Sequence, residues 1–434
     1  MVRTRINDTT KLEAGVVRIL KLSAYCYPEQ ESSSHLTDDL YEAYENAGYH
    51  VENYVPTPTR GVSERVRKEY SKKKTEELYN GHIVIHRFAM FREGRNPIGR
   101  AIRYLLVNLV QYWKGIHADN IDIVYSGSTP PTQGMLCSFV KRRLSRKYGR
   151  TVAMVFAIQD IFPDSLVASG LTRQGSLLWR LGRRISNYAY KNADRIITID
   201  ATLKQNIIEK GVPKEKIEVI PNWIDTNAVY PINRDKNKLF EEYSIDRNKF
   251  IVLYAGNMGA SQGTMVIAQA AAKLREFRDI YFVIFGDGTE KENVISESKN
   301  LNNISVYGLL PVERVSEVYS LGNVALITCK KGVGKSSVPS KLWSIMACNT
   351  PIIASFDTDS TLAETIKEAS AGRCVDPEDA DALAKAIYAE FLKWKNNKKL
   401  LVETRSYVIN HASKEVCTQK YVDIIHDCVV DVRK

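Results

Sequence analysis

Two series of short apolar runs alternate with amphipathic segments along this chain of 434 residues, and this alternation limits the possible folds most strongly. Runs rich in β-branched residues, each followed by a helical segment, predict parallel sheets of the α/β class. The first series comprises 16–24, 51–56, 82–88, 121–127, 151–158 and 194–200. The second begins near 250 with FIVLYAGN, IYFVIFGDG, ISVYGLL, VALITC and TPIIAS. We therefore predict two doubly wound, Rossmann-like domains.

A polar segment with two prolines separates the series. It reads VIPNWIDTNAVYPINRDKNK (219–238), and we place the interdomain connection there. Two similar domains that are joined once leave a cleft between them, and a cleft is the usual ligand site. In doubly wound sheets, ligands gather at the carboxyl ends of the strands. The Gly, Asn and Ser residues that end the second series are therefore candidate ligand-binding residues.

The positive charge is concentrated in the N-terminal half. The net charge is +11, and residues 1–220 hold 34 Lys and Arg against 23 Asp and Glu, whereas residues 221–434 hold 27 of each. Such a basic half favours an anionic partner, which is nucleic acid, anionic lipid headgroups or a pyrophosphate. A solvated basic surface without a partner is the alternative. No nucleic-acid-binding module is recognisable, so we expect no nucleic-acid partner.

Cysteine usage and hydropathy predict the cellular compartment. The seven cysteines show no CxxC and no paired spacing, which is typical of reduced thiols in the cytoplasm without a structural zinc site. The N-terminal segment MVRTRINDTTKLEAG lacks the apolar region of a signal peptide. The most apolar stretch, 101–113, is too short to span a bilayer. We expect a cytoplasmic protein that is soluble or peripheral to the membrane.

The stretch CKKGVGKSSVPSK (329–341) resembles a phosphate-binding P-loop only superficially. The full pattern needs glycine at 329, where Cys329 stands. Proline is favoured in the first turn of a helix and disfavoured further inside, so we predict a helix that begins near Pro339. Backbone N–H groups at that helix start, with the side chains of Ser336, Ser337, Ser340 and Lys341, would form an anion site for a diphosphate. An ordinary capped helix beside a basic loop is the alternative.

Several motifs together resemble a known enzyme family. FIVLYAGNMGASQG, FGDGTEKENV, ISVYGLLPVERVSEVYSLGNVALI and VPSKLWSIMACNTPIIAS follow one another as in the nucleotide-sugar domain of GT-B glycosyltransferases. In the N-terminal half, SAYCYPEQ, AIQDIFPDS and KNADRIITID resemble the acceptor domain. The chain is similar to glycosyltransferase family 4. Within it, AGNMG with VPSK resembles the bacterial O-antigen and capsule branch that includes N-acetyl-L-fucosamine transferases.

The resemblance implies a domain plan and a reaction. Residues 1–222 would form the acceptor domain, 223–405 the nucleotide-sugar domain, and 406–434 a C-terminal helix that returns to the N-terminal domain. A sugar, expected to be N-acetylated, would leave a UDP donor with its anomeric configuration retained. It would join a polyprenyl-pyrophosphate-linked or glycan acceptor in surface glycan synthesis. Protein groups rather than a metal would neutralise the diphosphate, and no cofactor is expected.

The resemblance also implies roles for individual residues. Asp160 would be the catalytic residue that faces the acceptor and the reacting sugar. The donor and its diphosphate would be held by Asn257, Gly259, Gln262, Ser336, Ser337, Val338, Ser340, Lys341 and Ser344. The nucleotide pocket would contain Gly286, Gly288, Tyr307, Gly308, Leu309 and Leu310. A loop that closes on the donor would carry Tyr27, Pro28 and Glu29.

Some positions differ from the family pattern. Ser336 and Ser344 stand where many relatives have glutamates, and Asn257 and Gln262 stand where many have Arg and Lys. The positive charge missing there is available from Lys330, Lys331, Lys335 or Lys341, and we favour Lys341. Two alternatives stay open. One is a UDP-sugar 2-epimerase on the same fold, which would need titratable acid and base groups around the sugar, and the serines of 329–344 argue against it. The other is an inactive regulator that binds nucleotide sugars, since the usual glutamates are absent.

Three further patterns carry weaker signals. Asp357-Thr-Asp359 and Asp379-Ala-Asp381 resemble a metal-binding Asp-x-Asp, but two carboxylates alone make a poor metal site, and we expect no metal. His82 and His86 flank a strand-like run, so a zinc site there is disfavoured. The segments 172–191 and 141–150 are basic, and the first is also amphipathic. They fit either core helices with solvated faces or docking on an anionic membrane surface.

Overall fold

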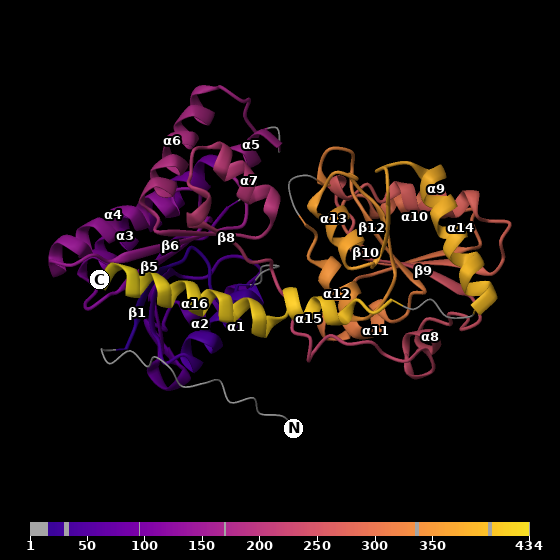
Figure 1. Ribbon diagram of the computed structural model, residues 1–434, viewed down its shortest axis with the longest axis horizontal. Helices are drawn as coiled ribbons and strands as arrows, with labels where there is room; N and C mark the ends of the chain where they lie inside the picture. Colours follow the sequence, from indigo (N-terminus) through magenta and orange to yellow (C-terminus); the bar gives the residue numbers. More distant parts are fainter. Residues whose placement is uncertain are drawn as a thin grey trace. The chain divides into compact units, whose positions relative to one another are not determined.

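The structure, a computed structural model, describes residues 16–29, 34–94, 96–168, 171–334, 338–397 and 402–433. The chain divides into two compact units (Figure 1). Unit 1 comprises Met1–Ile197, Val212–Glu218 and Thr418–Lys434, and unit 2 comprises Thr198–Gly211 and Val219–Cys417. Each unit contains a sheet with helices on both faces, which confirms the predicted α/β class.

Unit 1 is built on an eight-stranded sheet with the order β3-β4-β2-β1-β5-β6-β7-β8. Its strands are β1 (Arg18–Leu22), β2 (His50–Pro56), β3 (Thr75–Leu78), β4 (Ile83–Phe88), β5 (Ile123–Gly127), β6 (Ala153–Ile158), β7 (Arg195–Thr198) and β8 (Ile217–Val219). The pairs β1–β2, β1–β5, β2–β4 and β5–β6 are parallel, as predicted. The edge strand β3, which sequence reasoning missed, pairs antiparallel with β4.

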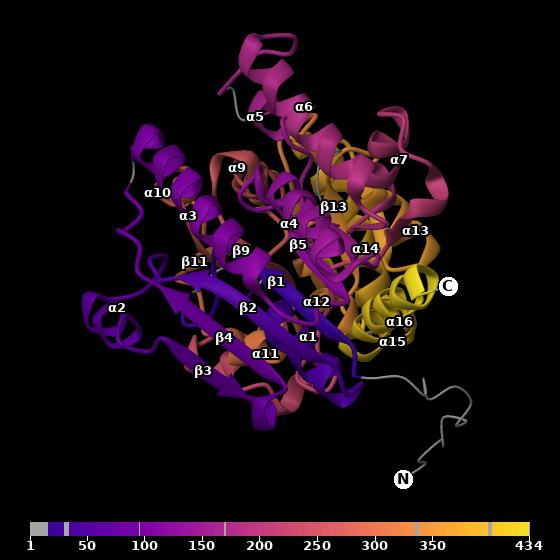
Figure 2. The same cartoon turned by 90° about the vertical axis from the view of Figure 1, so that its left-hand side faces the viewer.

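The direction in which each helix of unit 1 connects two strands determines which face of the sheet the helix covers. They are α1 (Ser34–Asn46), α2 (Glu64–Tyr70), α3 (Pro97–His117), α4 (Gln133–Tyr148), α5 (Asp164–Ala168) and α6 (Leu177–Asn192). Helix α1 connects β1 to β2, a step toward the β3 edge of the sheet. Helices α3, α4 and α6 connect β4 to β5, β5 to β6 and β6 to β7, which are steps toward the β8 edge. Because such crossovers are right-handed, α1 covers one face and the other three cover the opposite face. Figure 2 shows α3, α4 and α6 side by side.

The C-terminal helix α16 (Lys414–Arg433) contributes its residues from Thr418 onward to unit 1. Its Tyr421 ring lies 6.4 Å from the ring of Tyr125 on β5. Arg433 donates to Asp122 at 2.9 Å, just before that strand. These contacts attach the end of the chain to the first sheet.

Unit 2 is built on a six-stranded parallel sheet with the order β11-β10-β9-β12-β13-β14. Its strands are β9 (Phe250–Asn257), β10 (Ile280–Asp287), β11 (Ile304–Tyr307), β12 (Val324–Thr328), β13 (Ile352–Ser355) and β14 (Gly372–Val375). Its helices are α7 (Ala201–Glu209), α8 (Leu239–Glu242), α9 (Met265–Lys273), α10 (Lys291–Ser298), α11 (Val315–Tyr319), α12 (Lys341–Ala347), α13 (Thr361–Glu368), α14 (Ala380–Asn397) and α15 (Arg405–His411).

The core of unit 2 lies on both faces of its sheet. Side chains of the central strand β9 alternate between two buried clusters, one containing Leu253 and Met346 and the other containing Tyr254 and Leu326. This double burial explains why the strand is apolar throughout. Within the part of the chain that the structure describes, no helix is both long and apolar enough to cross a membrane.

Candidate functional site

The carboxyl ends of β9 and β10 form the centre of the candidate site in unit 2. The two strands are in register to their last residues, so that Gly286 pairs with Gly256 and Asp287 with Asn257. Gly288 follows with a φ of 146°, and a Cβ there would lie 2.6 Å from the backbone carbon of Met258. Only glycine allows this close approach of the two loops. The structure thus brings together three of the predicted site residues, Asn257, Gly286 and Gly288.

Lys341 is the positively charged group of this site. Helix α12 begins at Lys341 rather than near Pro339, so its start was predicted about two residues too early. The ammonium Nζ is buried, has no hydrogen-bond acceptor among the described residues, and lies 4.1 Å from the ring centre of Tyr254. A Cβ at Gly256 would lie 3.1 Å from it. Lys341 therefore points at the glycine-rich end of β9.

The electrostatics of Lys341 follow from this burial. Removal of the ammonium from water lowers the pKa of Lys341 from 10.5 to about 7, because the charged form loses hydration that no nearby acceptor replaces. A buried cation without an acceptor is costly unless an anion binds to it. The lysine therefore fits a ligand that carries negative charge.

The loop after β12 is tied to its surroundings on two sides. Thr328 donates to the carbonyl of Gln262 at 2.6 Å, and the Lys330 amide donates to the carbonyl of Ser261 at 3.0 Å. The carboxylate of Asp357 accepts from the amides of Gly332 at 3.0 Å and Gly334 at 2.8 Å. Asp357 is thus a loop anchor, a role that its Asp-x-Asp pattern did not suggest. Ser336, Ser337 and Lys335 lie outside the described residues.

The other predicted donor residues differ in exposure. Asn257 and Ser340 are exposed, whereas Gly259, Gln262 and Ser344 are half-buried. A Cβ at Gly259 would lie 3.1 Å from Nδ2 of the Asn257 side chain. Glycine at 259 therefore lets the side-chain amide of Asn257 fold back over the loop. Val338 packs against the hydrophobic core, so any contact with a ligand would come from its backbone.

The predicted base-binding segment follows β11. The ring of Tyr307 stacks on Phe285 with 5.4 Å between the ring centres, and it meets Tyr243 edge to face at 4.6 Å. Leu310 packs against the same core, while Gly308 and Leu309 are exposed. The aromatic packing therefore fixes the segment and leaves Gly308-Leu309 at the surface of the unit.

In unit 1, the predicted donor loop after β1 is held by its own glutamate. Glu29 is buried, and its carboxylate accepts from the amides of Cys26 at 3.2 Å, Thr59 at 2.7 Å and Arg60 at 3.0 Å. Burial raises the pKa of Glu29, and these amide hydrogen bonds oppose the rise. Tyr27 is exposed and Pro28 is half-buried. Glu29 thus shapes the loop, and Tyr27 is the residue presented to solvent.

Asp160, the predicted catalytic residue, lies just beyond the carboxyl end of β6. The residue is exposed, yet neighbouring protein atoms raise the pKa of its carboxyl, while the hydroxyls of Ser165 and Ser128 lower it. A carboxylate at this position can accept a proton or a hydroxyl hydrogen bond.

Sequence reasoning missed a cationic cluster near the carboxyl ends of β1, β2 and β4. Glu93 is contacted by Arg60 at 3.0 Å, Arg100 at 3.0 Å and Arg103 at 3.7 Å. Tyr25 donates to the same carboxylate at 2.7 Å. Arg103 is fully buried, and two of its guanidinium nitrogens have no hydrogen-bond partner among the described residues. Three arginines around one carboxylate leave an excess of positive charge.

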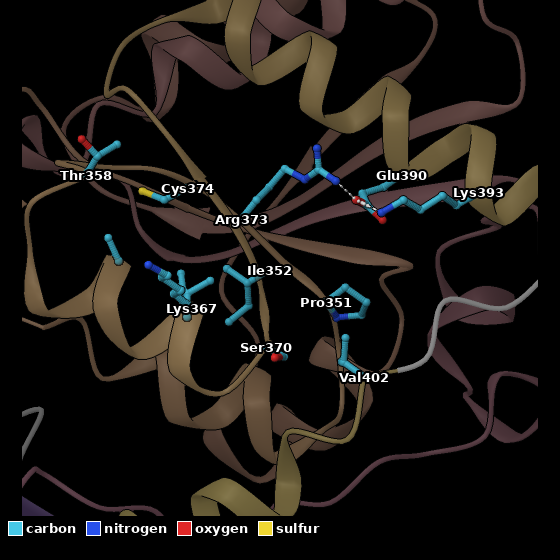
Figure 3. Close-up of a pocket in the computed structure, with 13 residues that line it drawn as sticks. Pro351, Ile352, Thr358, Lys367, Ser370, Arg373, Cys374, Glu390, Lys393 and Val402 are labelled. Atoms are coloured by element: carbon cyan, nitrogen blue, oxygen red, sulfur yellow. Dashed lines mark hydrogen bonds and ion pairs between the residues drawn. The ribbon is translucent and has the colours of Figure 1, made fainter.

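A separate cavity of about 670 Å³ lies in unit 2 and is lined by residues of β13, β14, α13 and α14 (Figure 3). Its Arg373 and Lys393 both contact Glu390, at 2.6 Å and 2.9 Å. None of the predicted site residues that the structure describes lines this cavity. No group of three potential metal ligands of the His, Cys, Asp or Glu type occurs among the residues described.

Comparison with solved structures defines the class. The structure of Anabaena Alr3699/HepE in complex with UDP aligns with a TM-score of 0.68 at 14% identity, covering 95% of this chain and 100% of that one. The chain therefore has the GT-B fold of glycosyltransferases, two α/β units with parallel sheets, as the motifs predicted.

Comparison of sequences then gives the family. Residues 34–228 match the model "Glycosyltransferase Family 4", and residues 235–413 match "Glycosyl transferases group 1". Together the two models account for most of the chain, which belongs to glycosyltransferase family 4.

Two curated bacterial proteins are similar over part of their length. The probable glycosyltransferase WbjE of Pseudomonas aeruginosa is 28% identical over 61% of this chain and 65% of its own. The putative colanic acid biosynthesis glycosyl transferase WcaI of Escherichia coli (strain K12) is 27% identical over 67% of this chain and 71% of its own. The chain thus aligns with roughly two thirds of each.

Proposed function

We propose that this protein is a retaining glycosyltransferase that transfers a sugar from a UDP donor without a metal ion. The observation that carries the proposal is the buried ammonium of Lys341, which lacks an acceptor and points at Gly256 at the end of β9. The HepE protein, which shares the fold, was solved with UDP. A nucleoside diphosphate carries the negative charge that would pair with this ammonium, and hydrogen bonds between charged groups are the strong ones.

The proposed reaction places negative charge where Lys341 lies. The bond between the anomeric carbon and the β-phosphate oxygen breaks, and a bond from an acceptor hydroxyl oxygen to that carbon forms. The leaving UDP gains negative charge as the bond breaks, and a preorganised ammonium stabilises that charge in the transition state. The acceptor hydroxyl loses a proton, and Asp160 is the candidate in unit 1 to accept it or to orient the hydroxyl.

We propose a polyprenyl-pyrophosphate-linked or glycan acceptor in the synthesis of a bacterial surface glycan. The similarity to WcaI, whose name refers to colanic acid biosynthesis, supports the pathway class. The excess of arginines around Glu93 supports an acceptor that carries phosphate. The resemblance of AGNMG and VPSK to the O-antigen and capsule branch supports an N-acetylated sugar. Such an acceptor lies in a membrane, so we also propose a peripheral position on an anionic membrane surface.

The test begins with donor selection and then measures turnover. A thermal-shift panel of nucleotide sugars should identify the donor, because a ligand at many times its Kd raises Tm by mass action. Turnover of that donor with a lipid-linked acceptor, in the presence of a chelator, should yield a product with the anomeric configuration of the donor.

Each alternative gives a different outcome of this test. An epimerised nucleotide sugar without an acceptor indicates a 2-epimerase. Donor binding without any turnover over a range of acceptors indicates a regulator that binds nucleotide sugars. Either result overturns the proposed reaction and leaves the fold and the family intact.

A further inference from the structure

One surface of unit 1 is strongly cationic. Helices α3, α4 and α6 carry three, five and four Lys and Arg residues, and none of them contains an Asp or Glu. On α4, the side chains of Arg142, Arg143 and Arg146 are exposed, and on α6 so are those of Arg180 and Arg184. Acids of other elements, Glu93, Asp119 and Asp194, pair with four of the cations on these helices. The exposed arginines of α4 and α6 make no ion pair among the described residues. Because ordinary surface helices mix charges of both signs, these exposed arginines indicate an anionic partner.

The same surface carries a continuous apolar stripe. On α3, large apolar side chains are exposed with helical spacing, at Ile98, Ile102, Leu105, Leu106, Leu109 and Trp113. Leu105, Leu109 and Trp113 are 60%, 57% and 61% exposed. The stripe extends along most of a 21-residue helix, which is roughly 30 Å long. Isolated exposed leucines are normal, but a contiguous stripe of this size marks a binding surface.

The cationic and apolar residues belong to one layer. Helices α3, α4 and α6 cover the same face of the sheet, opposite α1 (Figure 2). The ring of Phe139 on α4 lies 5.1 Å from that of Tyr188 on α6, which joins these two helices. At the start of α6, Leu177 is 85% exposed and Leu178 and Leu181 are exposed beside it. The outer surface of the layer therefore combines aliphatic and cationic side chains.

We infer that the outer surface of α3, α4 and α6 docks on an anionic phospholipid membrane. Aliphatic and aromatic residues that lie beside Arg and Lys suit the boundary between acyl chains and headgroups, where both kinds of side chain find partners. A protein interface is depleted of charge at its core, and a nucleic-acid surface offers no site for exposed leucines. The exposed arginines of α4 and α6 match the negative charge of the lipid headgroups.

This inference rests on the membrane association proposed above and names the surface that makes the contact. The sequence pattern singled out 172–191 and 141–150, which contain most of α6 and the C-terminal part of α4. The structure adds α3, whose apolar stripe is the larger part of the surface. Docking is independent of donor chemistry, so turnover of a water-soluble acceptor analogue tests the transferase reaction separately from membrane binding.

The apolar stripe is tested with the double variant Leu105→Glu/Leu109→Glu. Co-sedimentation is measured with vesicles of phosphatidylcholine, with and without phosphatidylglycerol. We expect the variant to lose at least roughly tenfold in affinity for the anionic vesicles, since two carboxylates replace leucines that would otherwise insert at the lipid boundary. Leu392→Glu, at an exposed leucine of α14 in unit 2, is the matched control and should bind as the wild type does. UDP binding should be unchanged in both variants.

The cationic residues are tested with Arg142→Gln/Arg143→Gln/Arg146→Gln. Each basic residue at an anionic surface strengthens binding roughly fivefold, so we expect a loss of roughly a hundredfold with anionic vesicles only. Arg275→Gln/Lys299→Gln in unit 2 is the control. The inference would be overturned if the wild type does not bind anionic vesicles, or if the Leu105/Leu109 and Arg142/Arg143/Arg146 variants bind them as tightly as the wild type does. The inference would also be wrong if the wild type is a dimer and Leu105→Glu/Leu109→Glu yields monomers whose vesicle binding is unchanged, because the stripe would then be a dimer interface.

Discussion

The ammonium of Lys341 lies 4.1 Å from the ring centre of Tyr254, buried and without a hydrogen-bond acceptor among the described residues. The tyrosine hydroxyl donates to the carbonyl of Asn257 at 2.6 Å, so the ring is fixed at the end of β9. The Lys341 ammonium is thus held over the ring of Tyr254, beside the glycine-rich end of β9, in a position to bind an anion. The following predictions test this relationship and the site around it.

Lys341→Gln should weaken UDP binding. The loss of one charge-assisted contact costs about 2 kcal/mol, which is roughly thirtyfold in Kd. Lys341→Arg keeps the charge but needs more room than Gly256 leaves, so it should restore binding only in part. Calorimetric titration with UDP measures both. Equal affinity of Lys341→Gln and wild type would refute the assignment of Lys341.

UDP affinity should fall as the pH rises above 7. Since the pKa of Lys341 is about 7 in the free protein, the lysine must gain a proton when the diphosphate binds at higher pH. The phosphates of UDP are already ionised there. The Kd should therefore rise roughly tenfold per pH unit above 7, with uptake of about one proton at pH 8. Titrations in buffers of different ionisation enthalpy measure this uptake, which Lys341→Gln should lack.

The same pKa predicts the pH dependence of stability without ligand. The unfolded protein has the ordinary lysine pKa of 10.5, and the folded protein has about 7. Between these values the unfolded state binds more protons, so the free energy of unfolding rises with pH. Lys341→Met should flatten this rise in chemical denaturation followed from pH 7 to pH 10. A wild-type curve that falls over this range would contradict the shift.

Gly256→Ala should reduce both stability and UDP affinity. Gly256 has a φ of 127°, which other residues rarely adopt, and a Cβ would lie 3.1 Å from Lys341 Nζ. We expect a loss of about 1–3 kcal/mol in the free energy of unfolding and weaker UDP binding, because the ammonium must move. Gly127→Ala is the control, since its Cβ would meet no atom within 4 Å. Thermal unfolding and calorimetry compare the two.

Asp160→Asn should slow turnover and leave UDP binding intact. The substitution removes the negative charge that can accept a proton, which contributes roughly a hundredfold or more to kcat in general base catalysis. Asp119→Asn, an exposed aspartate of unit 1 that pairs with Lys147, is the control. Steady-state kinetics with saturating donor provide the measurement. A normal kcat for Asp160→Asn would remove Asp160 from the mechanism.

Asp357→Asn distinguishes a loop anchor from a metal ligand. Loss of the carboxylate weakens two amide hydrogen bonds to Gly332 and Gly334, so stability should fall by about 1–3 kcal/mol and UDP affinity should fall with it. Asp359→Asn, which changes the second carboxylate of the pattern, is the comparison variant. If activity requires a divalent cation and both variants raise the concentration of cation needed, the Asp-x-Asp pattern is a metal site and the anchor role is wrong.

The sequence predicts the central strands well and the edges poorly. Apolar runs such as 250–257 are recognisable because they are buried on both faces. The edge strand β3 (TEEL) escapes prediction because half-exposed strands need few apolar residues. The short strand β14 also lies at an edge, where Gly372 is required because a Cβ would lie 1.9 Å from the carbonyl oxygen of Ile352.

The candidate site is predicted by position but not by side-chain orientation. The glycines at the ends of β9 and β10 and the lysine of VPSK are recognisable in the sequence, since strand ends and motifs fix where they lie. The inward packing of Val338, the buried carboxylate of Glu29 and the anchor role of Asp357 depend on contacts between distant segments. The Arg60–Glu93 pair is of the same kind, because it joins two loops that 33 residues separate.

The most direct measurement is calorimetric titration of wild type and Lys341→Gln with UDP, at pH 7 and with an excess of chelator. The account predicts that the wild type binds UDP equally with and without the chelator, and that Lys341→Gln binds it roughly thirtyfold more weakly. Loss of wild-type binding when the chelator is added, or an unchanged Kd for Lys341→Gln, would contradict it.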